Sequence, residues 1–374
     1  MAQGATAFGI DLYRRLGREA GNLFFSPLSI SGAFGMAQAG ARGETEAEIA
    51  RILHYELPRE RLHPALGAMM RGMALDQTGR RLAVANAVWV QRDYPLLPDY
   101  VGLLDGHYGA APETVDFIAD AAAAADRINQ WAERNTNGRI KNLLRAGDLD
   151  ASTRLVLTNT VWMKADWLRQ FHPLMTRPGN FFAAGGKAQQ VPFMHQQEPF
   201  RHLDAPGFQA IELPYRGEEL AMIVFLPKAR DGLAAFEREL DAAALERWIG
   251  QLRSAEPEPV DLVLPKIRLE TRYQLARTLQ EMGMSLAFGP GADFSGIDGR
   301  GGLFIAKAIH QTFLQVDEKG TEAAAATALV MAESSAPPPP RIRFHADHPF
   351  FFLIRDNRSG AVLFMGRITQ PPAA

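Results

Sequence analysis

Apolar residues recur along the chain at two spacings, one typical of helices and one typical of strands. Phe8, Leu12 and Leu16 lie on one stripe and predict a helix over residues 5–20. Short apolar runs, some of them alternating with polar positions, predict buried strands. Further helices are predicted after Ser26 and at residues 44–53 and 121–134, single strands at 23–25, 82–91 and from 154, a strand then a helix within 260–284, a strand within 304–320, and hairpins within 208–228 and 350–368.

The most informative stretch is VDEKGTEAAAATALVMAESSA, residues 316–336, which four prolines follow. As a helix, it would be capped by Thr321, with Glu322 in the first turn and four alanines after it. As a strand, it would place the odd-numbered residues from Thr321 on one face, small near Gly320 and larger further on. Such a strand could slide between two existing strands, with Gly320 as its hinge. The pattern leaves both interpretations open.

The composition indicates a large core and excludes cysteine chemistry. The chain has 374 residues, 47% of them hydrophobic, and no Ser/Gly linker or charge run divides it. A net charge of −2 predicts no general affinity for nucleic acid. The absence of cysteine excludes a disulfide, a thiolate nucleophile and a Cys-based zinc site.

Targeting signals are weak in this sequence. No run reaches about 18 uninterrupted apolar residues, so we expect no membrane span. The first residues, MAQGATAFGIDLYRRLG, lack the apolar run of a signal peptide. We therefore expect a cytoplasmic protein, or a secreted one if a leader has been removed.

No enzyme signature is present. The chain lacks G-x-S-x-G, H-E-x-x-H and the phosphate-binding G-x-x-x-x-G-K, and its nine histidines do not cluster in the sequence. The glycine-rich stretch at residues 289–302 does not have the strand–loop–helix order that a nucleotide loop needs. We expect a protein that is not an enzyme and that holds no metal or cofactor.

Two motifs give the chain a family resemblance. EKGTEAAAATA, residues 318–328, resembles the proximal hinge of inhibitory serpins, and FHADHPFFFLI, residues 344–354, matches the serpin signature position by position. The agreement extends along nearly the whole chain. The resemblance implies an α+β serpin fold with three β-sheets, about eight or nine helices and an exposed reactive-centre loop at about residues 318–342. It also implies that residues 1–374 form a single domain.

The resemblance assigns roles to two groups of residues. The first is a hinge through which the loop enters the main sheet: Glu318, Gly320, Thr321, Ala323, Ala325 and Thr327. The second is a region where that sheet opens: Ser26, Ser29, Asn159, His310, Trp167 and Lys266. In this family the lysine pairs with the hinge glutamate, and the buried asparagine is expected to contact His310 and the two serines.

The implied function is suicide inhibition of serine proteases. The protease cleaves the loop, becomes acylated, and is trapped covalently as the loop inserts into the main sheet. The spacing usual in the family places the cleaved bond at Ser334–Ser335, which favours elastase-, chymotrypsin- or subtilisin-like targets. Cleavage after Met331 or Ala332 is an alternative, as are papain-like cysteine proteases.

One rival within the same fold is a non-inhibitory carrier, chaperone or storage protein. Such members often carry bulky or charged hinge residues, whereas this hinge has Thr321 followed by Glu322 and alanines. The resemblance also implies a monomer that forms loop-into-sheet polymers on heating.

Overall fold

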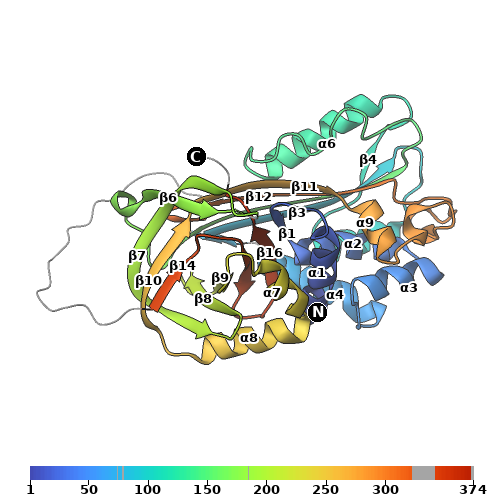
Figure 1. The fold of residues 1–374 in the computed structure, drawn as a ribbon. Helices are drawn as coiled ribbons and strands as arrows, with labels where there is room; N and C mark the ends of the chain where they lie inside the picture. The colour runs from blue at the N-terminus through green and yellow to red at the C-terminus, as the bar shows by residue number, and fades with distance from the viewer. Residues whose placement is uncertain (74, 78–79, 184, 322–341, 372–374) are drawn as a thin grey trace, which may run out of the picture.

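A computed structural model of the chain describes residues 1–73, 75–77, 80–183, 185–321 and 342–371 (Figure 1). Within these residues there are ten α-helices, where about eight or nine were expected. The α-helices are α1 (Ala2–Leu16), α2 (Pro27–Gly40), α3 (Gly43–Ile52), α4 (Arg59–Met73), α5 (Pro98–Leu103), α6 (Ala121–Asn135), α7 (Leu233–Glu239), α8 (Ala242–Ser254), α9 (Leu275–Glu281) and α10 (Ser295–Asp298). Three further single turns are η1 (Leu104–Tyr108, a π-helix), η2 (Pro173–Met175) and η3 (Leu286–Phe288).

The described strands fall into two hydrogen-bonded systems. One is seven-stranded, in the order β11-β12-β13-β5-β3-β2, with β4 paired to β3. Its strands are β2 (Leu75–Gln77), β3 (Arg80–Gln91), β4 (Glu113–Val115), β5 (Leu155–Asp166), β11 (Ile267–Gln274), β12 (Lys307–Val316) and β13 (Gly320–Thr321). We call this system the main sheet.

The other system has nine strands, in the order β1-β16-β15-β9-β8-β7-β10-β14, with β6 paired to β7. Its strands are β1 (Leu23–Phe25), β6 (Arg177–Phe182), β7 (Ala188–Asp204), β8 (Phe208–Pro214), β9 (Leu220–Pro227), β10 (Glu258–Pro265), β14 (Ile342–His345), β15 (Phe350–Asp356) and β16 (Val362–Ile368). Strand β7 is long enough to pair with β6 and β10 along most of its length and with β8 at its end. At β7 this system divides into one sheet of β6, β7, β10 and β14 and another of β1, β16, β15, β9, β8 and the end of β7. With the main sheet, these make the three sheets that were expected.

Helices cover the main sheet on both faces. Helix α6 lies across its outer face, while α1 to α4 and α9 gather on the other side (Figure 1). All 14 residues of α2 are buried, and this helix contacts β3, β5 and β16. Its residues are mostly apolar or small, with Ser29, Ser31 and Gln38 as the buried polar exceptions, so α2 forms a buried platform beneath the main sheet.

The prediction for residues 260–284 was wrong in one respect. It gave one strand before the helix, whereas β10 and β11 both precede α9. The break falls at Pro265 and Lys266, and the strand that follows alternates buried Ile267 and Leu269 with exposed Arg268 and Glu270. This period of two indicates a strand with one covered face, and the long apolar run before it concealed the signal.

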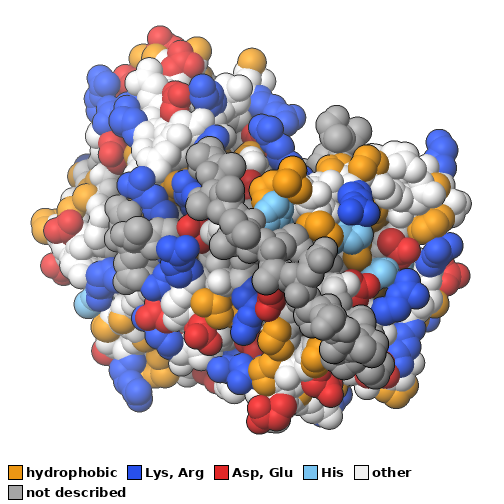
Figure 2. Space-filling view, turned by 90° about the vertical axis from the view of Figure 1, so that its left-hand side faces the viewer, with side chains coloured by type: hydrophobic (Ala, Val, Ile, Leu, Met, Phe, Trp, Pro, Cys, Tyr) orange, Lys and Arg blue, Asp and Glu red, His pale blue; other side chains and the backbone are white. Residues whose placement is uncertain are grey.

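Charge is mixed on the face formed by β6, β7, β10 and β14. Figure 2 shows Lys and Arg side chains interspersed with Asp and Glu over the part that is described. Within the described residues, no helix combines the length and apolarity needed to cross a lipid bilayer.

Candidate functional site

The centre of the main sheet changes its pairing part-way along. Strands β5 and β12 are parallel neighbours, with Lys307–Phe313 aligned to Val156–Trp162. Beyond that point β13 lies between them and is antiparallel to both. Thr321 is aligned with Ala165 on one side and with Val316 on the other. The start of the expected hinge is therefore already a strand of the sheet, which agrees with the strand interpretation for these two residues.

Gly320 is required here for close packing. A Cβ at this position would overlap the carbonyl oxygen of Ala165 and crowd the Cα of Asp166. Its φ of +159° lies at the edge of the range that residues with a side chain rarely adopt. The expected role of Gly320 as a hinge stays a prediction, and the packing adds a second reason for glycine, because a side chain would keep β13 from lying so near β5.

A tight turn over Asp317–Gly320 joins β12 to β13. The Asp317 N–H donates to the Gly320 carbonyl at 2.8 Å, and the Asp317 carboxylate accepts the N–H of Lys319 at 3.0 Å. The segment after β5 then binds the outer side of the turn. Trp167 N–H donates to the Lys319 carbonyl and Phe171 N–H to the Glu318 carbonyl, both at 2.8 Å. The turn is thus held by its backbone as well as by side chains.

Glu318 pairs with the lysine that the resemblance assigned to it. Lys266 Nζ lies 2.7 Å from Glu318 Oε1, and the Thr176 hydroxyl donates to the same oxygen at 2.6 Å. Burial raises the pKa of Glu318, but the hydrogen bonds from Lys266 and Thr176 outweigh it and lower the pKa overall. Glu318 is therefore held as a carboxylate at the junction of the turn with β10 and η2.

Trp167 and Tyr215 form the wall against which β13 rests. Their rings are stacked with centroids 4.5 Å apart, and the Trp167 indole N–H donates to the Asp317 carbonyl at 3.0 Å. The Tyr215 hydroxyl is 2.8 Å from the Thr321 hydroxyl, and both side chains are fully buried. Burial raises the pKa of Tyr215, so its hydroxyl stays protonated. Thr321 therefore already points into the core.

A second cluster lies lower on the same joint, where β5 and β12 pair directly. His310 on β12 is aligned with Asn159 on β5, and His310 Nδ1 is hydrogen-bonded to Asn159 Oδ1. The Asn159 amide donates to the Ser29 hydroxyl and to its carbonyl, the latter at 3.3 Å. The Ser26 N–H donates to His310 Nε2 at 3.1 Å, and Ser26 Oγ caps α2 by accepting from Ser29 N–H. We call Ser26, Ser29, Asn159 and His310 the polar joint.

The polar joint fixes the state of its histidine. Because Ser26 N–H donates to Nε2, the ring proton sits on Nδ1 and faces Asn159. A second proton would point at the Ser26 donor in a site without solvent. Burial lowers the pKa of His310 to about 3, so the ring is neutral over the physiological range.

The structure thus brings the predicted sheet-opening residues together in two places. Glu318, Gly320, Thr321, Trp167 and Lys266 meet at the upper end of the β5–β12 joint, and the polar joint lies below them. The roles assigned to these residues stay predictions. Ala323, Ala325, Thr327, Ser334 and Ser335 lie outside the described residues.

Three contact residues were not predicted from the sequence. Tyr215 and Thr176 contact Thr321 and Glu318, and the Asn86 amide oxygen accepts from Asn159 across the β3–β5 pair. A polar residue inside the apolar run of residues 82–91 was a usable signal for Asn86. Nothing local to Tyr215 or Thr176 indicates that they meet the hinge, because both contacts depend on distant strands.

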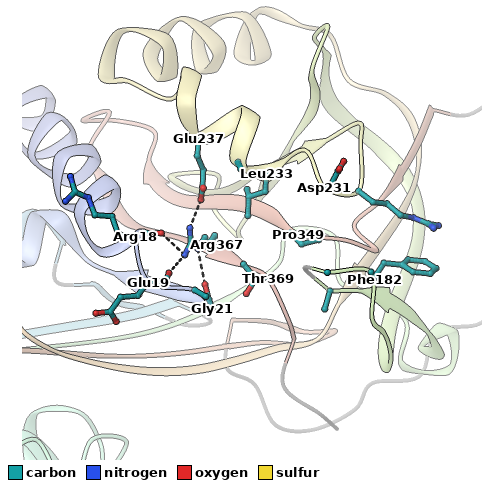
Figure 3. A pocket seen from close by; sticks show the side chains of 17 residues that line it. Arg18, Glu19, Gly21, Phe182, Asp231, Leu233, Glu237, Pro349, Arg367 and Thr369 are labelled. Carbon is teal, nitrogen blue, oxygen red and sulfur yellow. Dashed lines mark hydrogen bonds and ion pairs between the residues drawn. The ribbon is translucent and has the colours of Figure 1, made fainter.

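A pocket of about 710 Å³ lies elsewhere, between the end of α1, α7 and the end of β16. Arg367 lines this pocket (Figure 3) and donates to Glu237 and to the carbonyls of Gly17, Glu19 and Gly21. Its side chain is only 7% exposed, and Glu237 balances its charge while the carbonyls accept its remaining N–H groups. We therefore interpret Arg367 as a tie between the two ends of the chain. Among the described residues, no three His, Asp or Glu side chains are grouped as metal ligands would be.

Comparison with known proteins identifies the family. The family model described as serpin (serine protease inhibitor) matches residues 3–371. The chain belongs to the serpin family. The leukocyte elastase inhibitor of Sus scrofa is 34% identical over 98% of both chains. An uncharacterized serpin-like protein of Thermococcus kodakarensis is 41% identical over 98% of this chain and 84% of its own length.

Solved serpin structures share the architecture. Uncleaved ovalbumin superposes with a TM-score of 0.89 at 26% identity and 99% coverage of both chains. Human thyroxine-binding globulin in complex with thyroxine also gives 0.89, at 28% identity over 99% of this chain and 98% of its own. These findings confirm the α+β serpin fold. They include a relative named as an elastase inhibitor and one named for thyroxine binding, so family membership supports protease inhibition in general and leaves the target open.

The first prediction concerns the Lys266–Glu318 pair. Lys266→Ala leaves a mostly buried carboxylate without its cation, and we expect a loss of about 1 kcal/mol in the stability of the intact form, with faster polymerisation on mild heating. The lowered pKa of Glu318 makes this contribution complete above pH 4.5, and it disappears as the pH falls through the folded-state pKa. Thermal midpoints and size-exclusion chromatography after heating measure both effects.

Lys228→Ala is the matched control, because it removes a more exposed pair with Asp204 at 2.6 Å. Equal effects of the two substitutions would contradict the assignment.

The second prediction concerns the pH dependence of the polar joint. The pKa of His310 is about 3 in the folded chain and 6.5 for an unperturbed ring, so unfolding takes up a proton between these values. Stability therefore falls as the pH drops below 6.5, by up to about 1.4 kcal/mol per pH unit. In His310→Gln the amide can still accept from Ser26 and donate to Asn159, but it cannot titrate. We expect the wild type to lose about 2 kcal/mol relative to this variant between pH 7 and pH 5. The other histidines titrate in both proteins, and parallel pH profiles would exclude the assignment.

Proposed function

We propose that this serpin is a suicide inhibitor of serine proteases and that residues 1–374 act as one domain. A protease binds residues 318–342 as a substrate and cleaves one bond within them. Cleavage leaves the catalytic serine of the protease acylated by the new C-terminus of the loop. The freed chain then enters the main sheet behind Thr321, between β5 and β12. The protease is carried with it, and the distorted acyl-enzyme does not hydrolyse.

The observation that carries this proposal is the position of β13. Gly320 and Thr321 already form the first two residues of a strand that is antiparallel to both β5 and β12. In the same register, the chain after Thr321 would have to run between β5 and β12 where they now pair directly. In such a strand the odd-numbered residues would share the inward face of Thr321, and the next three, Ala323, Ala325 and Thr327, are small. Small side chains leading a strand lower the cost of parting the sheet.

Backbone pairing supplies the driving force. About a dozen inserted residues would gain a similar number of hydrogen bonds, on the order of 10 kcal/mol in all before ordering costs. That matches the stability of a whole typical domain. The intact form is then a kinetically trapped state, and the polar joint and the Lys266–Glu318 pair contribute to the barrier. None of these residues takes part in bond chemistry.

The bond that we propose for cleavage is Ser334–Ser335, with Met331 and Ala332 as alternative cleavage positions. Small residues before the cut suit elastase- and subtilisin-like pockets, and Met331 suits a chymotrypsin-like one. One relative is named as an inhibitor of leukocyte elastase, which supports an elastase-like target for this chain. Mass spectrometry of the cleaved chain identifies the bond.

The proposal is tested by incubation with elastase, subtilisin and chymotrypsin. We expect a covalent complex that survives a denaturing gel, and a cleaved form with a thermal midpoint well above that of the intact form, because insertion completes the sheet. Cleavage without a complex but with a raised midpoint would indicate a substrate-like serpin. Cleavage that leaves the midpoint unchanged would exclude insertion.

The third prediction tests the path of insertion. Thr321→Arg places a charge at a fully buried position, which is costly because the hydroxyl that Thr321 contacts there, that of Tyr215, is neutral. We expect insertion to slow and the inhibitor to become a substrate, with at least a tenfold rise in the number of inhibitor molecules consumed per protease trapped. Thr321→Ser keeps the hydroxyl and Leu174→Arg adds the same charge at an 82% exposed site, so both should trap protease normally. Normal trapping by Thr321→Arg would overturn the insertion path.

A further inference from the structure

The layer formed by α6 and the loop after it contacts both halves of the main sheet. On one side of the β5–β12 joint, Trp131 packs edge-to-face on Trp89 of β3, with centroids 5.7 Å apart. Arg127 of α6 also pairs with Glu113 of β4 at 2.8 Å. These contacts bind the helix to the half that contains β3, β4 and β5.

The loop that follows α6 reaches the other half. Arg272 lies on β11, beyond β12, and its Nε donates to the Leu143 carbonyl at 2.7 Å. The Arg272 guanidinium also forms an ion pair with Asp148, whose other oxygen accepts from Gln274 at 2.7 Å. The side chains of Arg272 and Asp148 are only 11% and 12% exposed, so water competes weakly for either charge.

The loop and the helix are themselves joined. Asn129 of α6 donates its amide to the Leu144 carbonyl at 3.0 Å and accepts the Leu144 N–H at 2.8 Å. Leu143 and Leu144 are buried in one apolar cluster with Ile309 of β12 and Val156 of β5. A continuous set of contacts therefore runs from β3 and β4, through α6 and its loop, to β11.

We propose that the contact of Arg272 with Asp148 and Leu143, which we call the clasp, sets the rate at which the main sheet opens. A new strand between β5 and β12 moves β11 away from β3 by about 4.8 Å, the spacing of neighbouring strands. Hydrogen bonds of 2.7 Å do not stretch that far, so either the clasp breaks or α6 leaves its seat on β3. Opening must overcome this contact before the inserted strand has formed its own hydrogen bonds. The proposal rests on the proposed function, since it concerns the same insertion step.

The chain offers a matched control for the clasp. The Arg127–Glu113 pair also anchors α6, but both partners lie on one side of the joint and do not part when the sheet opens. Arg127→Ala therefore weakens the seat of the helix without removing a link across the joint. Arg272→Ala removes that link, whereas Asp148→Ala removes its ion pair and leaves the bond of Arg272 to the Leu143 carbonyl.

The experiment compares insertion rates after cleavage of the intact protein. Insertion is followed by the change in tryptophan fluorescence and by the appearance of the heat-resistant cleaved form. We expect Arg272→Ala to speed insertion about tenfold and Asp148→Ala to speed it by less, because the bond to the Leu143 carbonyl remains. The double variant should be no faster than Arg272→Ala, since that substitution already removes the whole clasp. Arg127→Ala should stay within about twofold of the wild type, and Arg272→Lys, which retains a cation without the forked contact, should lie in between.

The outcomes separate the clasp from the proposed function. If the wild-type protein shows no insertion after cleavage, the proposed function itself is wrong. A wild type that inserts while Arg272→Ala matches Arg127→Ala overturns the clasp alone. A purely structural role for Arg272 would lower the thermal midpoints of the intact and cleaved forms equally and leave the insertion rate unchanged, which also overturns it. Should Arg272→Ala fail to fold, Asp148→Ala and Arg272→Lys decide the question by the same rate.

Discussion

The direct pairing of β5 with β12 is the contact on which the rest of this molecule depends. It is a parallel ladder, and the strand that begins at β13 is antiparallel to both partners. Parallel pairing is slightly less stable per residue than antiparallel pairing. Extending β13 would replace one parallel ladder by two antiparallel ladders, so the sheet gains both in the number and in the quality of its hydrogen bonds. In the proposed mechanism, the present pairing persists because side chains on each side of the joint are bonded to one another.

The polar joint places those bonds where an apolar core would be expected. His310 and Asn159 face each other across the two strands, and Ser26 and Ser29 connect each of them to the N-terminus of α2. A buried polar network is stable only while every member is satisfied. If β5 and β12 part as we propose, the members would lose their partners together, so the cost of opening would be concentrated in one step. An apolar contact of the same area would be lost gradually and would give a lower barrier.

The sequence predicted much of this arrangement, and its failures have physical causes. Periodicity placed the helix over residues 121–134 and the hairpin at 208–228 because their patterns are local. The resemblance named Glu318 with Lys266 and Asn159 with His310, pairs that no local pattern relates.

Strand β11 was missed because its alternation follows directly on the buried run of β10. Tyr215 and Thr176 were missed because a contact between a hairpin end, a short turn and the hinge is a property of the assembled sheets. The choice between helix and strand was likewise beyond local propensity, since alanines favour a helix and only the pairing of Gly320 and Thr321 with β5 selects a strand there.

The contacts that would have to break can be separated from those that would persist. The ladders of the nine-stranded system contain neither β5 nor β12, although the Thr312 hydroxyl of β12 donates to the Phe24 carbonyl of β1 at 3.3 Å. On the proposed insertion path, widening the main sheet would strain this bond but would leave the ladders, the bonds of Arg367 and the stacking of Phe24 on Phe364 in place. A protein that changes one sheet needs such a frame, because widening both at once would expose the shared core. With that frame in place, the insertion that we propose would require only the β5–β12 joint to part, so a few side chains there could set its rate.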